Sequence, residues 1–442
     1  MGIKFHKILF VLPLFGLLAV AVWFNWHYLR KVSEAPTEYK TPQEADNAYV
    51  RFEMEAYDTI LTNFWKQATD TDMATVYQLS LKQSVGTSSM VFFPTSSRAG
   101  TASMLEYAFA RVSGPDAKKA LATQVLQTVL YNLPPKGRSK LLTNGEQLQL
   151  KNTVENVNPN NNLYKNIGAA PNASPAQVQV AFSEKQKTLQ GTTSIEGKAE
   201  LKKIAYAREV LTNQNKKAQY DQTKVEPTVF SHAIGPHTLY VYVSKIAPTA
   251  ITEFIQAIQD ASSSPQLHSL ILDFRGNIGG DITFTQNIMS LFLGPNEYAF
   301  DLYHQGAYVA QRTPNFGPLP ALLKYKEIAV LTDGMTQSTA ELTASALRRF
   351  HIATNIGTKT RGWGSVEHEF VLKNSIDSKE KYALLLVVDL TLGNNQQPIE
   401  QNGVVPDIDT SVAGWQNKLI NYFTSSSLMS AIIQSATAPP VQ

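Results

Sequence analysis

The segment LHSLILDF, residues 267–274, is a nearly continuous apolar run. Such a run is typical of a strand that is buried on both faces, as in a parallel sheet covered by helices. The segments around it predict strands and helices in alternation. HTLYVYVSKI and KEIAVLTD predict strands, and AITEFIQAIQDAS predicts an amphipathic helix. The segment KYALLLVVDLTL continues the pattern. We therefore expect an α/β region from about Phe230 onward.

The length and composition limit the classes of protein to consider. At 442 residues, the chain is too long for one ordinary hydrophobic core, so we expect two or three domains. A net charge of +3 and the lack of a basic stripe interleaved with aromatic residues argue against nucleic acid as a partner. The chain has no cysteine, which excludes disulfides, thiolate metal sites and a cysteine nucleophile.

The N-terminal segment predicts entry into the secretory route. Lys4 and Lys7 precede an apolar run from Ile8 to Phe24, which is near the lower length limit for crossing a bilayer. A cleaved signal peptide is the alternative, because Ala19–Ala21 forms an A-x-A site. We favour a membrane anchor at residues 1–33, because the run continues past that site into aromatic residues. Both interpretations put the bulk of the chain outside the cytoplasm, either anchored in a membrane or secreted.

Two helical regions are expected before the α/β region. Apolar side chains recur at helical spacing between Ala48 and Leu133, and the sequence PPKG then breaks the pattern. We assign this helical domain to residues 46–150. An Asn-rich stretch at 152–162 marks the next boundary.

The second helical region, residues 160–224, contains NLYKNIGAAPNASPAQVQVAFSEKQ and IAYAREVLTNQNKKAQYDQ. Ser174 and Pro175 predict the start of a helix. These segments resemble a J-domain, but the loop that should carry His-Pro-Asp reads KTLQGTT. J-domains stimulate their partner ATPase through that triplet, so we expect a spacer or docking module with a protein partner rather than a co-chaperone.

Two predicted strand ends lead into residues suited to catalysis. The first reads DFRGNIGG, and the paired glycines Gly279 and Gly280 let backbone N–H groups approach a ligand closely. The second reads LTDGMTQSTAE and puts Ser338 at or just before a helix N-terminus, where a developing negative charge is favoured. Each signal alone is weak, because an N-cap serine and a glycine turn are common.

The blocks LILDFRGNIGG, VLTDGMTQSTAELTASALRRF, NIGTKTRGWGSVEHEF and QNGVVPDID follow one another in this order. Together they resemble the C-terminal processing, or tail-specific, serine peptidases, and we assign residues 228–415 to such a domain. The resemblance implies a mixed sheet flanked by helices. It also implies Ser338 as nucleophile and an oxyanion hole from the backbone N–H of Thr339 with that of Gly279 or Gly280.

The chain departs from that family at the general base and in its domain order. The family has a lysine in a Thr-x-Gly-Lys-Gly turn, where this chain has Trp363, and a glutamine where it has Glu367. An indole cannot accept the proton of a serine hydroxyl. A general base contributes roughly 100- to 10,000-fold in rate. The family also places a peptide-binding PDZ domain where this chain has the J-like module.

Several residues are candidates to replace the missing lysine. Glu367 could act as a substitute base or orienter if burial raised its pKa. For each of the others a surface or core role is favoured; these are Lys359, His351, His232, His237 and His368.

The sequence predicts an N-terminal membrane-spanning helix, two all-α domains, an α/β peptidase-like domain, and a helix and tail at 416–442. The favoured function is a serine-type peptidase that hydrolyses polypeptides. The alternative is a disabled pseudo-peptidase that binds extended peptides by strand addition; a J-protein co-chaperone is the least favoured. No cofactor and no metal site are expected, since the histidines are scattered and none forms H-E-x-x-H.

Overall fold

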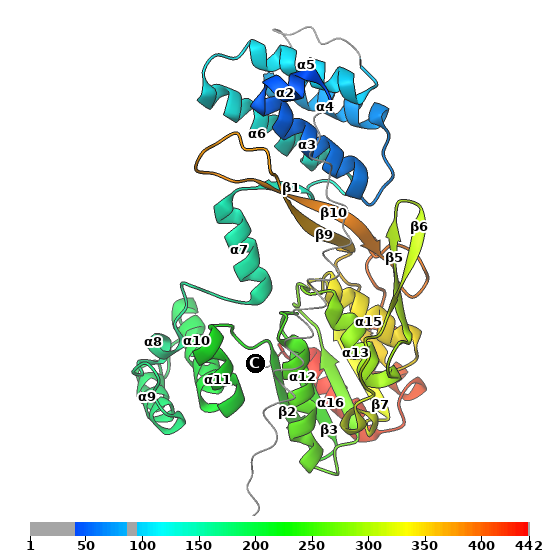
Figure 1. The fold of residues 1–442 in the computed structure, drawn as a ribbon. Helices are drawn as coiled ribbons and strands as arrows, with labels where there is room; N and C mark the ends of the chain where they lie inside the picture. Colours follow the sequence, from blue (N-terminus) through cyan, green and yellow to red (C-terminus); the bar gives the residue numbers. More distant parts are fainter. Residues whose placement is uncertain (1–39, 86–94, 441–442) are drawn as a thin grey trace, which may run out of the picture. The chain divides into compact units, whose positions relative to one another are not determined.

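The computed structural model describes residues 40–85 and 95–440 (Figure 1). The chain divides into two compact units, one ending at Leu141 but including His368–Val388, and one made of the remainder. The expected anchor at residues 1–33 lies outside the described residues. Within the described ranges, no helix has both the length and the apolar character needed to cross a membrane.

The first unit is built mainly of helices. These are α2 (Pro42–Asp46), α3 (Ala48–Asn63), α4 (Asp70–Val85), α5 (Arg98–Ala110) and α6 (Pro115–Asn132). Asn47 caps α3 through its side chain, and a proline begins α6. Arg98 joins the buried carboxylates of Glu44 and Asp58 at 2.6 and 2.7 Å. Glu53 of α3 is also fully buried.

Residues 368–388 belong to this helical unit, although the sequence groups them with the α/β region. The carboxylate of Glu55 accepts the backbone N–H groups of Lys373 and Asn374 at 2.7 and 2.8 Å. Lys119 and Asp377 form an ion pair at 2.7 Å. The unit is therefore assembled from two distant parts of the chain.

The second unit begins with five helices among the described residues. They are α7 (Asn144–Glu155), α8 (Leu163–Ile167), α9 (Pro175–Thr188), α10 (Ile195–Thr212) and α11 (Gln214–Thr223). Ser174 caps α9 in a capping box with Gln177, as its position before a proline predicts. The helices α8 to α11 enclose a small core of their own, which includes Tyr164, Phe182 and Tyr220.

A six-stranded sheet forms the centre of the second unit. Its strands, in spatial order, are β11 (Ile408–Asp409), β8 (Thr354–Gly357), β7 (Glu327–Thr332), β4 (Ser269–Asp273), β3 (Thr238–Val243) and β2 (Val229–Ile234). Neighbouring strands pair in parallel, except for the antiparallel pair β2–β3. The expected α/β fold with a mixed sheet is thus confirmed.

Both faces of this sheet are covered. Leu270 and Leu272 of β4 enter one core, and Ile271 between them enters the other, because successive strand side chains point to opposite faces. The first core contains α12 (Ala250–Asp260), α13 (Thr283–Leu293), α14 (Pro320–Leu323) and α15 (Thr339–Arg349), and the 3₁₀ turn η1 (Ala261–Ser263) follows α12. The second core contains η2 (Trp415–Asn421) and α16 (Ser426–Thr437).

The C-terminal segment is not one helix, as expected for residues 416–442, but a 3₁₀ helix followed by an α-helix. The break has a tertiary cause. The carboxylate of Glu327 accepts the backbone N–H groups of Thr424 and Ser425 at 2.5 and 3.1 Å, which holds this stretch out of helical geometry. Ser425 then caps α16.

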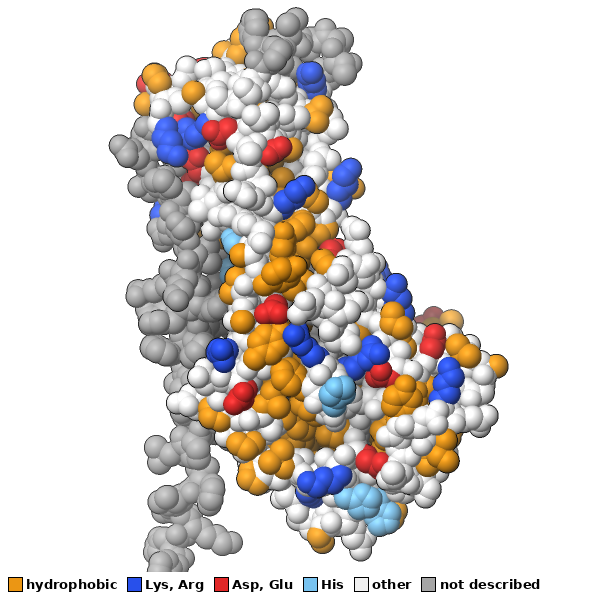
Figure 2. Space-filling view, turned by 90° about the vertical axis from the view of Figure 1, so that its right-hand side faces the viewer, with side chains coloured by type: hydrophobic (Ala, Val, Ile, Leu, Met, Phe, Trp, Pro, Cys, Tyr) orange, Lys and Arg blue, Asp and Glu red, His pale blue; other side chains and the backbone are white. Residues whose placement is uncertain are grey.

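A second sheet contains β1 (Lys140–Leu142), β10 (Ala383–Thr391), β5 (Tyr298–His304) and β6 (Ala307–Arg312) in that order, with β9 (Ser365–Val371) also paired to β10. Leu390 and Thr391 at the end of β10 pair with Tyr303 and Leu302 of β5. On the face shown in Figure 2, charges of both signs are scattered among hydrophobic side chains, without a basic stripe.

Candidate active site

Two loops leave the carboxyl ends of adjacent parallel strands and lie side by side. Strands β4 and β7 pair through Asp273 and Leu331, so the loops that follow them start together. The N–H of Gln337 donates to the carbonyl of Asn277 at 2.8 Å. The hydroxyl of Thr336 donates to the carbonyl of Phe274 at 2.9 Å. The loop before Ser338 is therefore fixed against the loop that carries Gly279 and Gly280.

Ser338 has an unusual backbone conformation. Its φ of 53° and ψ of −127° are rarely adopted by residues other than glycine. Such a conformation costs on the order of 1–3 kcal/mol and persists only where the surroundings impose it. The residue is half-buried and directly precedes α15, so its side chain lies at the positive end of the helix dipole.

Gly279 lies against the serine. A Cβ atom at this position would be 2.6 Å from the Cβ of Ser338 and 3.0 Å from the N of Thr339, and the φ is +86°. Only glycine fits these two conditions. The N–H of Gly279 donates to the side-chain oxygen of Asn277 at 2.8 Å, so it is not a free donor.

The two amides that stay available are those of Gly280 and Thr339. Neither N–H makes a hydrogen bond to any of the described residues. Of the two glycines that the sequence offers for an oxyanion hole, the geometry thus favours Gly280. The backbone of Ile246 bonds both chain neighbours of Gly280. Its N–H donates to the carbonyl of Gly279 at 3.1 Å, and its carbonyl accepts the N–H of Asp281 at 3.0 Å.

Asn277 organises this loop from within. Its side chain is fully buried, and its amide nitrogen donates to the carbonyl of Val243 at 2.7 Å. The sequence analysis did not select it. An asparagine between strand and glycine pair is a local signal for such a turn, because its side chain bonds the backbone two residues on.

Glu341 joins the serine to the loop that carries Trp363. Its buried carboxylate accepts four donors: the N–H of Ser338 at 2.9 Å, the hydroxyl of Thr360 at 2.5 Å, and the N–H groups of Gly362 and Trp363 at 2.7 and 2.8 Å. Burial raises the pKa of Glu341, and the four hydrogen bonds offset part of this rise.

Ser338 and Trp363 donate to the same oxygen of Glu341, so their nitrogens lie within about 6 Å of each other. The half-buried Trp363 therefore starts close to the serine backbone. Glu367 follows on β9, and its carboxylate accepts the hydroxyl of Ser365 at 2.6 Å.

Lys359 lies in the same region as the serine loop. Its side chain is exposed, and its backbone carbonyl is 3.9 Å from a Cβ built on Gly334. His351 follows the other end of α15, and eleven helical residues separate the two ends by about 16 Å.

His232 and His237 are not brought to Ser338 by the fold. His237 precedes β3 and stacks on His268 at 5.0 Å, at the sheet edge opposite to the serine. His232 lies on the sheet face that Tyr240 occupies, with its ring 4.8 Å from that ring. His368 belongs to the first unit, where its Nδ1 is buried without a hydrogen bond to described residues and burial lowers its pKa.

Comparison with known proteins shows which class of enzyme this region resembles. Residues 237–410 match the model of "Peptidase family S41". A carboxy-terminal-processing protease of Bartonella bacilliformis is 30% identical over 154 residues, which is 35% of this chain and 33% of that protein. The chain thus spans about a third of the length of this curated relative.

Two solved structures are similar at lower levels. The photosystem II D1 C-terminal processing protease is 12% identical with a TM-score of 0.47, covering 82% of this chain and 93% of that one. A lipoprotein from Streptococcus agalactiae is 14% identical with a TM-score of 0.45, covering 88% and 99%. The likeness to serine peptidases rests on the family match and on the Bartonella relative.

The segment 237–410 is therefore a domain of the serine-type peptidase class. Within that class, the sequence of this segment is similar to peptidase family S41.

Proposed function

We propose that this protein is a tail-specific serine peptidase that cleaves polypeptides outside the cytoplasm, with Ser338 as its nucleophile. The observation that carries the proposal is the strained turn at Ser338 beside two unengaged N–H groups, those of Gly280 and Thr339. A turn that costs free energy is expected at a site of function rather than at an ordinary helix cap.

The proposed reaction is acyl transfer in two steps. The Oγ of Ser338 attacks the scissile carbonyl carbon, and the N–H groups of Gly280 and Thr339 donate to the oxyanion that forms. One such donor is worth roughly 100- to 1,000-fold in rate. The proton of the serine passes through the general base to the leaving amine, and water then hydrolyses the acyl-enzyme.

Glu367 is our candidate for the base. It lies four residues after Trp363, whose backbone shares an acceptor with that of Ser338. The side chain of Glu367 is half-buried, and positioned glutamates act as general bases.

The second candidate function is a disabled peptidase that binds polypeptides without cutting them. Trp363 favours it, because an indole N–H donates but does not accept a proton. In this version the two N–H groups hold a substrate carbonyl, and the serine stays protonated.

The helices α8 to α11 are proposed as a J-like docking or spacer module with a protein partner. The packing of this module on the sheet supports a fixed spacer. The ring of Tyr206 lies 5.9 Å from that of Phe230, and Lys216 Nζ lies 4.1 Å from the Phe230 ring centroid. Gln219 donates to Glu253 of α12 at 2.8 Å. The membrane anchor at Ile8–Phe24 stays a prediction.

The test incubates the purified protein with a permanently unfolded polypeptide, alongside Ser338→Ala, Trp363→Lys and Glu367→Gln. Glu369→Gln, a second carboxylate on β9, is the matched control. Cleavage by the parent that is lost in Ser338→Ala and Glu367→Gln but kept in Glu369→Gln supports the peptidase. Cleavage only by Trp363→Lys supports the disabled enzyme. If no variant cleaves, Ser338 is not a peptidase nucleophile.

A further inference from the structure

The helices α13 and α15 start at the same edge of the six-stranded sheet and run side by side. They follow β4 and β7, which are paired in parallel. The hydroxyl oxygens of Thr285 and Thr343 are 2.8 Å apart. About one helical turn earlier, the hydroxyl of Thr339 donates to the carbonyl of Gly280 at 2.9 Å. The residues that begin α13 therefore lie beside those that begin α15, where Ser338 is found.

Asp281 directly follows Gly280 and lies at the start of α13. The carbonyl oxygen of Gly280 is about 3 Å from the Cα of the next residue, so the Cα of Asp281 is within about 6 Å of the Thr339 hydroxyl oxygen. The Oδ1 atom of Asp281 accepts the N–H and the hydroxyl of Thr283, at 2.9 and 2.8 Å. These two bonds hold the carboxylate at the N-terminal end of α13, at the sheet edge where Ser338 lies.

The other carboxylate oxygen of Asp281, Oδ2, has no donor among the described residues. It is not one of the polar atoms that are buried without a partner, so it reaches solvent although the residue is half-buried. No lysine or arginine of residues 40–85 and 95–440 forms an ion pair with this carboxylate. Burial raises the pKa of Asp281, and the hydrogen bonds from Thr283 offset part of this rise. The carboxylate therefore has one open acceptor and no counter-charge.

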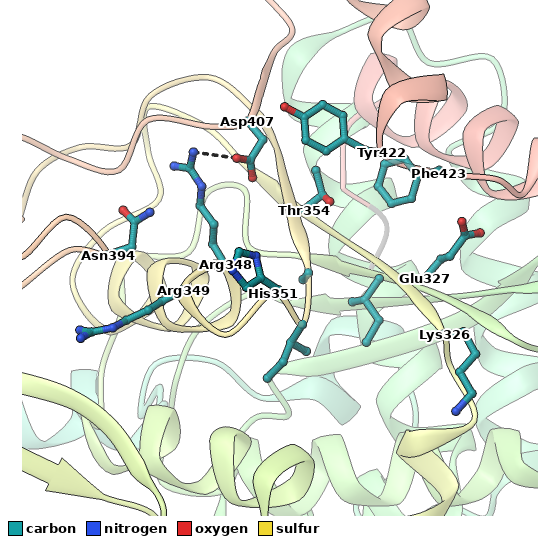
Figure 3. A pocket seen from close by; sticks show the side chains of 13 residues that line it. Lys326, Glu327, Arg348, Arg349, His351, Thr354, Asn394, Asp407, Tyr422 and Phe423 are labelled. Carbon is teal, nitrogen blue, oxygen red and sulfur yellow. Dashed lines mark ion pairs between the residues drawn. The ribbon is translucent and has the colours of Figure 1, made fainter.

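The carboxylates at the opposite edge of the same sheet are arranged differently. They line a cavity of about 570 Å³ where β7 and β8 begin (Figure 3). Asp407 pairs with Arg348 there at 2.7 Å, and its other oxygen accepts the N–H of Asn355 at 2.9 Å. Glu327 accepts two backbone N–H groups of the C-terminal segment. Each of these carboxylates has its donors within the chain, whereas Asp281 leaves one oxygen for a donor from outside it.

We infer that Asp281 forms a subsite for a positively charged side chain of a polypeptide, next to the bond that Ser338 attacks. The inference rests on the function proposed for the same site. A peptide carbonyl held by the N–H groups of Gly280 and Thr339 lies beside Asp281, because Gly280 is its neighbour in the chain. The ammonium group of a lysine or the guanidinium group of an arginine donates to Oδ2. An acidic side chain at the same place meets a like charge and binds poorly.

The test compares three short, unstructured peptides that carry a central lysine, glutamine or glutamate and are otherwise identical. Binding is measured by fluorescence anisotropy on the Ser338→Ala variant, so that the result does not depend on turnover. The lysine peptide is expected to bind at least about tenfold more tightly than the glutamine peptide, because charge-assisted hydrogen bonds are about twice as strong as neutral ones. The glutamate peptide should bind most weakly. Equal affinity for the lysine and glutamine peptides, or no binding of any peptide, would overturn the inference.

Asp281→Asn, made in the same background, separates a subsite from a simple helix cap. Asparagine caps helices as well as aspartate does, so the bonds from Thr283 and the fold should persist. The preference for lysine over glutamine should fall to less than about threefold. Asp260→Asn, at the last residue of α12, makes the same change of charge and should keep the preference. A preference that survives in Asp281→Asn, or that Asp260→Asn removes equally, would assign the selectivity to other charges and contradict the subsite.

Cleavage of the same peptides by the parent separates this inference from the proposed peptidase activity. If the lysine peptide binds best but no peptide is cut, the subsite is supported and the peptidase is not. If all three peptides are cut with equal kcat/KM, the peptidase is supported and the subsite is wrong.

Discussion

The hydroxyl of Thr339 donates to the carbonyl of Gly280 at 2.9 Å. This bond joins the two residues whose backbone N–H groups are unengaged beside Ser338. It fixes one donor relative to the other, which a pair of preorganised donors requires. The bond is also partly protected from solvent, since the side chain of Thr339 is buried.

Thr339→Val should therefore lower cleavage more than it lowers stability. The replacement keeps the shape but leaves the Gly280 carbonyl without its donor, at about 1–3 kcal/mol. We expect a loss of about tenfold or more in kcat, measured on the parent or on Trp363→Lys, whichever cleaves. Thr343→Val, at a buried threonine of the same helix, is the control. Equal losses of kcat in both variants would contradict a positioning role.

Gly280→Ala should destabilise the second unit more than Gly276→Ala does. Both glycines have a positive φ, but a Cβ on Gly280 would lie 1.9 Å from the carbonyl oxygen of Ile246, whereas that on Gly276 meets nothing within 4 Å. The expected difference is about 1–3 kcal/mol, the usual cost of overpacking. Urea unfolding measures it. Equal effects would mean that Ile246 moves aside freely.

Glu341→Gln should be strongly destabilising. A carboxylate can accept four donors here, whereas an amide presents one oxygen and turns its NH₂ group toward N–H groups. We expect a loss of about 2–4 kcal/mol in urea unfolding. Glu196→Gln, exposed on α10, should stay within about 0.5 kcal/mol of the parent. A Glu341→Gln protein as stable as this control would contradict the assigned hydrogen bonds.

Glu53→Met should stabilise the first unit, and more so at high pH. Glu53 is fully buried, its carboxylate oxygens have no hydrogen bond to described residues, and burial raises its pKa well above 4.5. The folded state therefore keeps a proton that the unfolded chain releases, and the parent loses stability as pH rises above 4.5. We expect a gain of about 1–4 kcal/mol at pH 8 and a smaller one at pH 5.

Thermal unfolding at the two pH values measures this gain, with Glu53→Gln as the control. The glutamine removes the titration but keeps a buried polar group, so it should flatten the pH dependence without the full gain. A gain from Glu53→Met that does not change with pH would show that Glu53 is ionised in the folded protein.

The parts of the fold that the sequence predicts are those with local causes. The apolar run at 267–274 predicts β4, and Ser174 with Pro175 predicts the start of α9. The glycine pair and Ser338 are also visible, because each follows a strand that the apolar pattern identifies. Their closeness in space follows from the parallel pairing of β4 with β7.

Other features depend on residues far apart in the chain. Glu327 interrupts the C-terminal helix from almost a hundred positions away, and Glu55 holds Asn374 across more than three hundred. Glu341 reads as an ordinary helical residue until the fold brings the loop of Thr360 to it. Patterns of local spacing carry no information on such partners.

The hydrogen bonds from Glu341 to Ser338, Gly362 and Trp363 all end on main-chain amides. None of them depends on which side chain stands at position 363. These three hydrogen bonds can therefore persist when the side chain at position 363 changes, and a single substitution can introduce a proton acceptor while the backbone of the loop stays bonded to Glu341. At position 363, the chemistry of the side chain can change without the loss of the hydrogen bonds that hold the loop to Glu341.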